Sequence, residues 1–169
     1  DLYRCFMERM WQHSAASGAV GLIHPETHFT DNRAGLLREA TYTRLRRHWQ
    51  FANELKLFEI DHHVTFGVHI YASTQTPRFL MATSLYHPDT VARSLSHDGS
   101  GTEPGLKDHE GNWDLRPHRG RVMAVNTDTL RTWHEMLGEG PGVPLLQTRM
   151  VYAVNRTTAA VLEKLTRAE

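Results

Sequence analysis

The stretch Val64-Thr65-Phe66-Gly67-Val68-His69-Ile70-Tyr71 alternates apolar residues with polar or small ones. This period of two is typical of a β-strand, because successive side chains point to opposite faces of a sheet. The apolar residues that we expect to be buried together on one face are Val64, Phe66, Val68 and Ile70. A second β-rich run at residues 51–58 and a short link at 59–63 predict an antiparallel hairpin.

Two helices and one further strand are predicted upstream of the hairpin. Residues 2–13 carry apolar side chains at helical spacing, and residues 19–24 form a short apolar run that suits a buried strand. A second helix, capped by Asp31 or Asn32, is expected to continue to about Trp49. The order helix, strand, helix, hairpin favours an α/β layer over a helical bundle.

The sequence after residue 73 is richer in loops and has a less regular pattern of apolar residues. The elements expected there are strands at 78–85, 121–126 and 145–154, a helical turn from 87, helices at about 127–137 and 157–168, and a glycine-rich loop at 96–120. A loop of that length inside a compact domain is usually functional or poorly ordered.

Composition restricts the classes of protein to consider. No apolar run approaches the roughly 20 residues that a membrane-spanning helix needs, and a single cysteine excludes an internal disulfide. We therefore expect a cytoplasmic protein without a membrane partner. Lysine plus arginine and aspartate plus glutamate both number 19, whereas a free-standing nucleic-acid binder usually shows a basic excess.

The twelve histidines raise the question of a metal site. His24 and His28 flank a proline at the end of a strand, where helical spacing does not apply. On an extended strand, His63 and His69 would lie ~20 Å apart. We therefore expect no stoichiometric zinc or iron, and polar histidines that are hydrogen-bonded or exposed.

Several short motifs occur in a family-specific order. They are Asp1-Leu2-Tyr3-Arg4-Cys5-Phe6-Met7-Glu8, the run Ser17 to Pro25, Gly35-Leu36-Leu37-Arg38, Glu54-Leu55-Lys56-Leu57-Phe58 and Val64 to Tyr71. Together they resemble the second half of the class I S-adenosylmethionine-dependent methyltransferase fold, as found in N6-adenine DNA methyltransferases. The sequences His24-Pro25-Glu26 and Asn53-Glu54-Leu55-Lys56-Leu57-Phe58 resemble those of large methylases of restriction–modification and phage-defence systems.

The resemblance implies a fold and a division of the chain. Residues 1–72 would be part of a Rossmann-like methyltransferase sheet that ends in an antiparallel hairpin. Residues 73–169 would be a following α+β segment that leads toward a target-recognition region. The family's cofactor loop and its Asn-Pro-Pro-Tyr catalytic loop do not occur in the chain. We therefore expect a fragment that is inactive in isolation, as the start at Asp1 without an initiator methionine also indicates.

The resemblance also assigns roles to individual residues. Leu2 and Tyr3 would lie near the S-adenosyl-L-methionine cofactor of the intact enzyme, and Phe58 would stack on the flipped-out base. An equally weighted alternative makes Phe58 a hydrophobic plug at the end of the hairpin. The basic residues expected to contact phosphates of double-stranded DNA are Arg116, Arg119 and Arg121.

Alternatives to the methyltransferase interpretation remain open. One is a non-catalytic DNA-binding or protein-interaction module, which the missing catalytic loop favours and the neutral charge disfavours. Another is an independent metal-dependent hydrolase built on the histidines. A partial sheet would also expose an edge strand, through which copies of the chain could associate.

Overall fold

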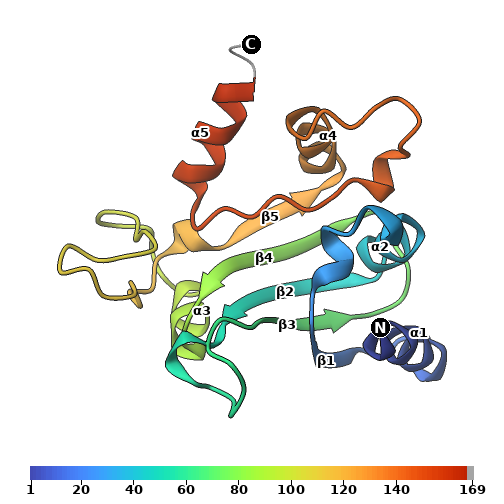
Figure 1. The fold of residues 1–169 in the computed structure, drawn as a ribbon, viewed down its shortest axis with the longest axis horizontal. Helices are drawn as coiled ribbons and strands as arrows, with labels where there is room; N and C mark the ends of the chain where they lie inside the picture. Colours follow the sequence, from blue (N-terminus) through green and yellow to red (C-terminus); the bar gives the residue numbers. More distant parts are fainter. Residues whose placement is uncertain (167–169) are drawn as a thin grey trace. The chain divides into compact units, whose positions relative to one another are not determined.

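The computed structural model describes residues 1–166, which form a mixed α/β fold (Figure 1). Its helices and strands, in chain order, are α1 (Leu2–His13), β1 (Val20–His24), α2 (Gly35–Tyr42), β2 (Leu45–Ala52), β3 (Thr65–Tyr71), β4 (Arg78–Leu85), α3 (Pro88–Ser94), β5 (Met123–Asn126), α4 (Thr127–Met136) and α5 (Arg156–Thr166). Short 3₁₀ helices lie between them: η1 (Thr27–Phe29), η2 (Asn32–Ala34), η3 (Asn53–Leu55), η4 (Arg119–Arg121) and η5 (Leu145–Gln147).

The five strands form one mixed sheet in the order β1-β3-β2-β4-β5 (Figure 1). Strands β1 and β3 are antiparallel, and Val20 at one end of their register pairs with Tyr71. Strands β2 and β3 are also antiparallel, because hydrogen bonds join Asn53 N–H to Val64 O (3.0 Å) beyond one end and Ala72 N–H to Arg44 O (2.9 Å) beyond the other. An antiparallel pair is therefore present, but its first strand lies at Leu45–Ala52 instead of the predicted 51–58, and the connecting loop is longer than the sequence indicated.

The chain divides into two compact units that both draw on residues from either side of residue 72. The first unit comprises residues 1–48, 67–80 and 124–151, and the second comprises 49–66, 81–123 and the described residues from 152 onward. Large apolar side chains buried in the first unit include Met7, Phe29, Tyr42, Leu45, Tyr71, Leu130 and Trp133. Those buried in the second include Phe51, Phe66, Met81, Leu85, Val91 and Val122.

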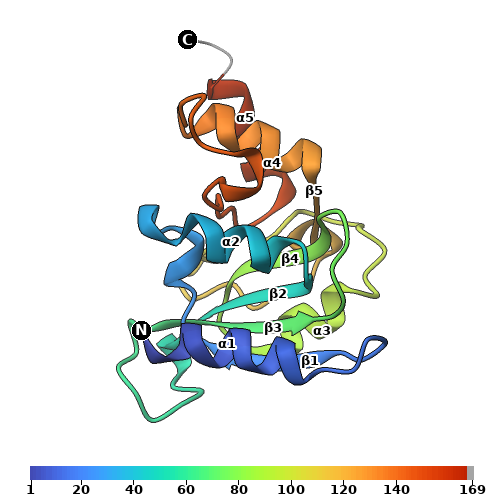
Figure 2. The same cartoon turned by 90° about the vertical axis from the view of Figure 1, so that its right-hand side faces the viewer.

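In the first unit, the helix α1 lies alongside the edge strand β1 (Figure 2). The helix α2 packs against η1 and η5, and its buried Arg38 ties these segments together. The Arg38 guanidinium donates to the backbone carbonyls of His28 (2.8 Å) and Gln147 (2.6 Å). A buried arginine here uses its rigid fork of donors to satisfy backbone acceptors that belong to no ladder.

Three predicted elements differ from the structure. The strand expected at residues 51–58 is one of them, because β2 ends at Ala52 and η3 follows it. The second helix was expected to reach Trp49, but it ends at Tyr42 and β2 begins at Leu45. Buried positions in β2 recur every third residue, a spacing that resembles a helical face in sequence. Pairing of β2 with strands on both sides overrides that local pattern.

The strand predicted at residues 145–154 is also absent from the described chain, where η5 leads into extended irregular backbone. Side chains take the carbonyls that a ladder would have used. Tyr42 donates to Thr148 O in the first unit (3.0 Å), and Thr83 donates to Ala153 O in the second (2.8 Å). The other predicted strands and helices are present with shifted ends. The predicted helix at 157–168 corresponds to α5 as far as Thr166, and its last two residues lie outside the described part of the chain.

The buried face predicted for β3 was wrong. Phe66 is buried, but Val64 is exposed and both Val68 and Ile70 are only partly covered. The alternate residues Gly67, His69 and Tyr71 are buried instead. The polar His69 can occupy a core position because the rings of His24 and His48 pack against it.

Among residues 1–166, no helix combines the length and apolar character required to cross a membrane.

Candidate functional site

The loop between β2 and β3 in the second unit carries the predicted base-stacking residue. The left-handed Lys56 (φ 52°) follows η3 and turns the chain, and its N–H donates to Asn53 O (2.8 Å). The loop closes where Asn53 N–H bonds to Val64 O, at the ends of the two strands. The residues at its tip are therefore presented from a rigid base of paired strands.

The fully buried side chain of Asn53 holds this loop from inside. Its Nδ2 donates to the carbonyl oxygens of Phe58 (3.0 Å), Ile60 (3.1 Å) and Asp61 (3.3 Å). Its Oδ1 accepts the backbone N–H of Phe58 (3.0 Å). Because the amide bonds to both the N–H and the carbonyl of Phe58, the backbone of that residue is fixed.

Phe58 lies partly on the surface of the second unit. One edge of its ring meets Phe66 at a centroid distance of 5.0 Å and an interplanar angle of 78°, and Phe66 stacks on Phe51. The side chain nevertheless stays 43% exposed, and Leu55 and Ile60 in the same loop are also exposed. The geometry therefore combines an anchored ring with an accessible aromatic surface, whereas a hydrophobic plug would be buried.

The two residues predicted near the cofactor differ in what they offer. Leu2 is 75% exposed at the start of α1. Tyr3 stacks on His24 (centroids 5.3 Å apart), and its hydroxyl accepts the His28 N–H (3.1 Å) and bonds Thr27 Oγ1 (2.9 Å). Leu2 thus presents free apolar surface, while Tyr3 is engaged in joining α1 to η1 within the first unit.

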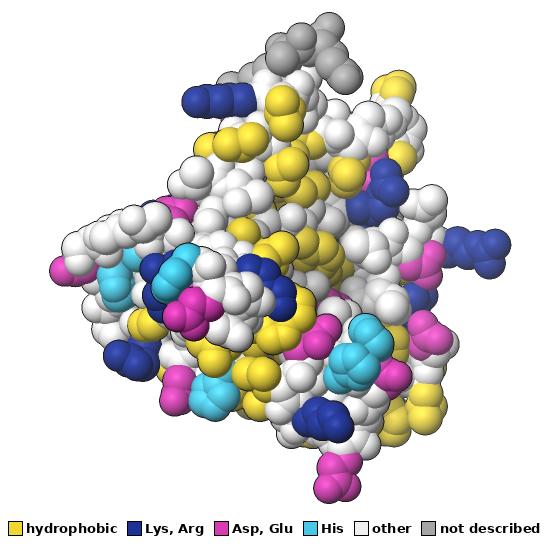
Figure 3. All heavy atoms as spheres, turned by 60° about the vertical axis from the view of Figure 1, so that its left-hand side comes forward, with side chains coloured by type: hydrophobic (Ala, Val, Ile, Leu, Met, Phe, Trp, Pro, Cys, Tyr) yellow, Lys and Arg dark blue, Asp and Glu magenta, His cyan; other side chains and the backbone are white. Residues whose placement is uncertain are grey.

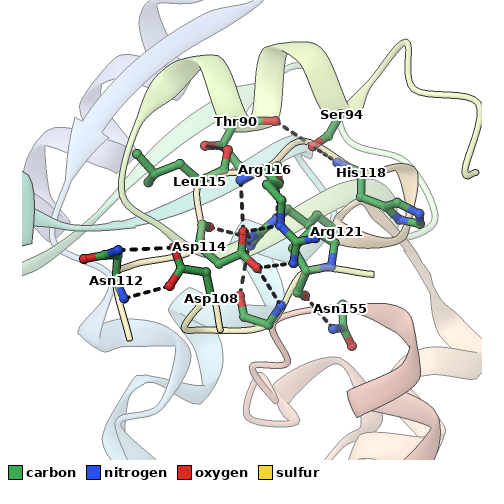
Figure 4. Close-up of polar contacts among 12 residues, drawn as sticks. Thr90, Ser94, Asp108, Asn112, Asp114, Leu115, Arg116, His118, Arg121 and Asn155 are labelled. Atoms are coloured by element: carbon green, nitrogen blue, oxygen red, sulfur yellow. Dashed lines mark hydrogen bonds and ion pairs between the residues drawn. The ribbon is translucent and has the colours of Figure 1, made fainter. Parts of the chain in front are cut away.

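The predicted phosphate-binding arginines are in three different environments in the second unit. Arg121 is 1% exposed and donates to the carbonyls of Arg116 and Asp114 (Figure 4). Arg116 is exposed but pairs with the buried Asp114 carboxylate (2.7 Å). Arg119 is exposed. The interior position of Arg121 makes it a structural residue of the loop, so only Arg116 and Arg119 remain accessible to a phosphate.

Asp114 organises the glycine-rich loop around these arginines. Burial opposes its charge, but hydrogen bonds and the charge of Arg116, together with the charge of Arg121, lower the pKa of the carboxyl overall. The same loop is tied to α3, because His118 N–H donates to Ser94 Oγ (3.0 Å) and Thr90 Oγ1 donates to Leu115 O (3.0 Å; Figure 4). The predicted long loop is therefore built on a buried charge network.

Sequence reasoning missed a cluster of four buried histidines in the first unit, which are His24, His28, His48 and His69. The rings of His24 and His69 stack at 4.0 Å and 2°, and His48 lies 4.9 Å from His69. Cross-strand register produces the stack, since Gly67 faces His24 and leaves room for the His69 ring. The glycine two residues before a strand histidine was the available signal.

Burial keeps this imidazole cluster neutral. It lowers the pKa of all four histidines and brings that of His48 to about 3. The 3.4 Å contact between His48 Nε2 and the Glu26 carboxylate therefore involves an uncharged ring at neutral pH. Within residues 1–166, these four rings do not bring three ligand atoms together around one point. We regard the cluster as an aromatic core with titratable members.

Charged side chains of both signs are mixed on one face of the molecule. In the view of Figure 3, basic, acidic and histidine side chains are interspersed across the face shown. Any contact with a polyanion on this face would rest on a few local cations, since long-range attraction needs a patch of one sign.

No protein-family model matches the sequence, and no curated protein matches it either.

Proposed function

We propose that the chain is part of an S-adenosylmethionine-dependent DNA adenine-N6 methyltransferase of a restriction–modification or phage-defence system. In this role it supplies base-stacking and DNA-contact surfaces, and it acts in the cytoplasm, where the DNA is. The observation that carries the proposal is Phe58, an accessible aromatic ring on a loop whose backbone is fixed by buried Asn53.

The chemistry of DNA methylation explains why such a ring is useful. An adenine amino group inside a duplex is out of reach, so the base must leave the stack at a cost of a few kcal/mol. An aromatic side chain that stacks on the extruded base returns ~1–3 kcal/mol. A ring presented from a preorganised loop loses little entropy on binding.

The strand arrangement is compatible with the proposal. Strands β2 and β3 are antiparallel neighbours, as the resemblance implies for the pair that closes the methyltransferase sheet, and β1 pairs with β3. The order helix, strand, helix, strand, strand along residues 2–71 also follows the expected order. Edge strand β1 is where self-association would occur.

The chain's own part in cofactor binding is small under this proposal. S-adenosylmethionine would supply the methyl group, and the exposed Leu2 fits an apolar contact with it. Tyr3 fits poorly as a direct ligand, because its hydroxyl is engaged by Thr27 and His28. The family's catalytic loop has no counterpart here, so we expect the 169-residue chain alone to show no methyl transfer.

A fluorescence titration tests the base contact. The probe is a mixed-sequence duplex with 2-aminopurine opposite an abasic site, where little energy is needed to extrude the base. We expect the wild-type chain to quench the probe by stacking, and Phe58→Ala to weaken binding roughly 5- to 150-fold, the equivalent of ~1–3 kcal/mol. Phe58→Tyr should retain the effect.

Phe6→Ala is the matched control, because Phe6 is the same ring on the surface of α1 and is more exposed than Phe58. It should leave binding and quenching unchanged. DNA binding that is indifferent to Phe58→Ala would instead favour the non-catalytic DNA-binding module. Equal losses in both alanine variants would show that exposed apolar surface, rather than base stacking, causes binding.

A further inference from the structure

Three consecutive polar side chains converge on the same loop as Phe58. The Nδ1 atoms of His63 and His62 lie 3.0 and 4.0 Å from Asp61 Oδ1, and the two imidazole centroids are 3.7 Å apart. Within residues 1–166, this is the one group in which three potential metal-ligand atoms lie within 4.8 Å of one another. Histidine spacing alone does not predict this group, because Asp61 supplies the third ligand atom.

These separations approach those of a coordination sphere. Two ligand atoms that each lie about 2.1 Å from a metal are roughly 3.0–3.4 Å apart at octahedral to tetrahedral angles. The His63–Asp61 distance already meets this value, and the His62 ring is exposed and needs only a small rotation. Three protein ligands would leave the remaining coordination positions to water.

The backbone holds Asp61 in place for this geometry. Its carbonyl accepts from Asn53 Nδ2 (3.3 Å) and from Val64 N–H (3.2 Å), which fixes the residue against the ends of β2 and β3. Its carboxylate accepts the His63 N–H (2.8 Å). The His63 ring also bonds this carboxylate through Nδ1 (3.0 Å), so these two ligand atoms already face each other.

In the described part of the chain, other histidine–carboxylate pairs near the surface do not bring a third ligand atom within 4.8 Å. They are His87 with Asp89, His97 with Asp98, and His109 with Glu110. Each pair offers two ligand atoms at most. The binding free energy from two such ligands is too small to offset the conformational entropy lost when their side chains become ordered. These pairs therefore serve as internal references for binding that depends only on exposed histidine.

We propose that Asp61, His62 and His63 form a binding site for one divalent transition-metal ion of the class that prefers imidazole and carboxylate ligands, such as Cu²⁺ or Zn²⁺. Imidazole suits these ions, and the order of affinity should follow Cu²⁺ above Ni²⁺ and Zn²⁺. Mg²⁺, which demands oxygen ligands, should not compete. A bound ion would cross-link the loop tip next to Phe58, independently of the proposed role in methylation.

Calorimetric titration of the tag-free chain with each metal alone tests the site. We expect one Cu²⁺ or Zn²⁺ per chain, with affinity lowered at least about tenfold by His63→Ala and by Asp61→Asn. Asp61→Asn keeps an acceptor for the His63 N–H and removes only the charge. His109→Ala is the matched control, since it removes an exposed histidine beside a carboxylate, and should leave the affinity unchanged.

Electron paramagnetic resonance of the Cu²⁺ form gives a second, independent readout. Coupling to two imidazole nitrogens is expected in the wild type, and to one nitrogen in either His62→Ala or His63→Ala. Because all three residues are exposed, these variants should retain the wild-type circular dichroism and thermal melt. Absence of binding, or binding that survives all three substitutions or is lost equally in His109→Ala, would overturn the proposal.

Discussion

Gly67 is a residue whose small size shapes the core of the first unit. It faces His24 across the strand pair, and the His69 ring lies over it. A β-carbon built at this position would overlap the imidazole of His69. Because the His69 ring is fully buried and stacked on His24, it has no free space to move into.

We therefore expect Gly67→Ala to lower the free energy of unfolding by ~1–3 kcal/mol, as overpacking of a core does. Urea denaturation measures the change. Gly21→Ala on the neighbouring strand is the control, because its added β-carbon would make only ordinary contact with Ile70, at 3.4 Å. If Gly67→Ala costs no more than Gly21→Ala, the His69 ring does not occupy the space over Gly67.

Individual side chains also show the limit of reading a site from sequence. Phe58 could be placed near the turn of a hairpin, because turn residues and apolar runs are local signals, although the predicted strand 51–58 is not the one observed. The burial of Arg121 could not be predicted, because a cluster of basic residues in a sequence is usually solvent-exposed. Only the structure places Arg121 in the interior beside Asp114. The imidazole cluster likewise depends on the register of β1 with β3, which pairs residues far apart in sequence.

At the scale of elements, the spacing of apolar residues along the sequence was enough to predict where most helices and strands lie. The exceptions are segments whose structure depends on pairing with distant parts of the chain. Strands β1, β3 and β4 and helices α1 and α4 lie near their predicted positions. Their buried faces are a different matter, because Ile23 on β1 and Phe6 on α1 are exposed and β3 buries the alternate residues. The strand β2 was not predicted at its position, because its buried residues recur every third position, as on a helix. The segment after η5 was predicted as a strand from its apolar content, but its carbonyls bond to side chains instead.

The β2–β3 loop yields a prediction at the element scale. In Asn53→Asp, an oxygen would replace the amide nitrogen that donates to three carbonyls, while the acceptor for Phe58 N–H would remain. Loss of these buried donors should lower the free energy of unfolding by ~1–3 kcal/mol. Amide exchange at residues 58–61 should accelerate more than exchange in β2.

Asn32→Asp makes the same chemical change at an exposed position and is the control. It should leave both stability and loop exchange near wild type. Unchanged exchange at residues 58–61 in Asn53→Asp would contradict the assignment of Asn53 as the residue that positions the loop.

At the scale of the whole molecule, charge balance and buried histidines together set the response to pH. Equal numbers of basic and acidic residues give no net charge at neutral pH, so global repulsion contributes little there. Four imidazoles in one buried cluster change that balance in mild acid. Protonation would place several positive charges within a few ångströms of one another, in surroundings from which water is excluded.

The sign of the effect follows from the pKa values. Burial lowers the pKa of each of these histidines in the folded chain below the ordinary value of 6.5, so the unfolded chain binds more protons. The stability that depends on neutral imidazoles is therefore complete above about pH 6.5 and is lost as pH falls, by up to ~1.4 kcal/mol per pH unit for each histidine.

We expect the free energy of unfolding, measured in urea, to drop by roughly several kcal/mol between pH 7 and pH 5. His69→Phe keeps a planar ring in the stack and removes one titrating group, so its pH dependence should be shallower by about one proton. His109→Phe, at an exposed position, should keep the wild-type slope. A wild-type stability that is flat from pH 7 to pH 5, or a slope that His69→Phe leaves unchanged, would mean that water reaches these imidazoles and that they do not form a closed core.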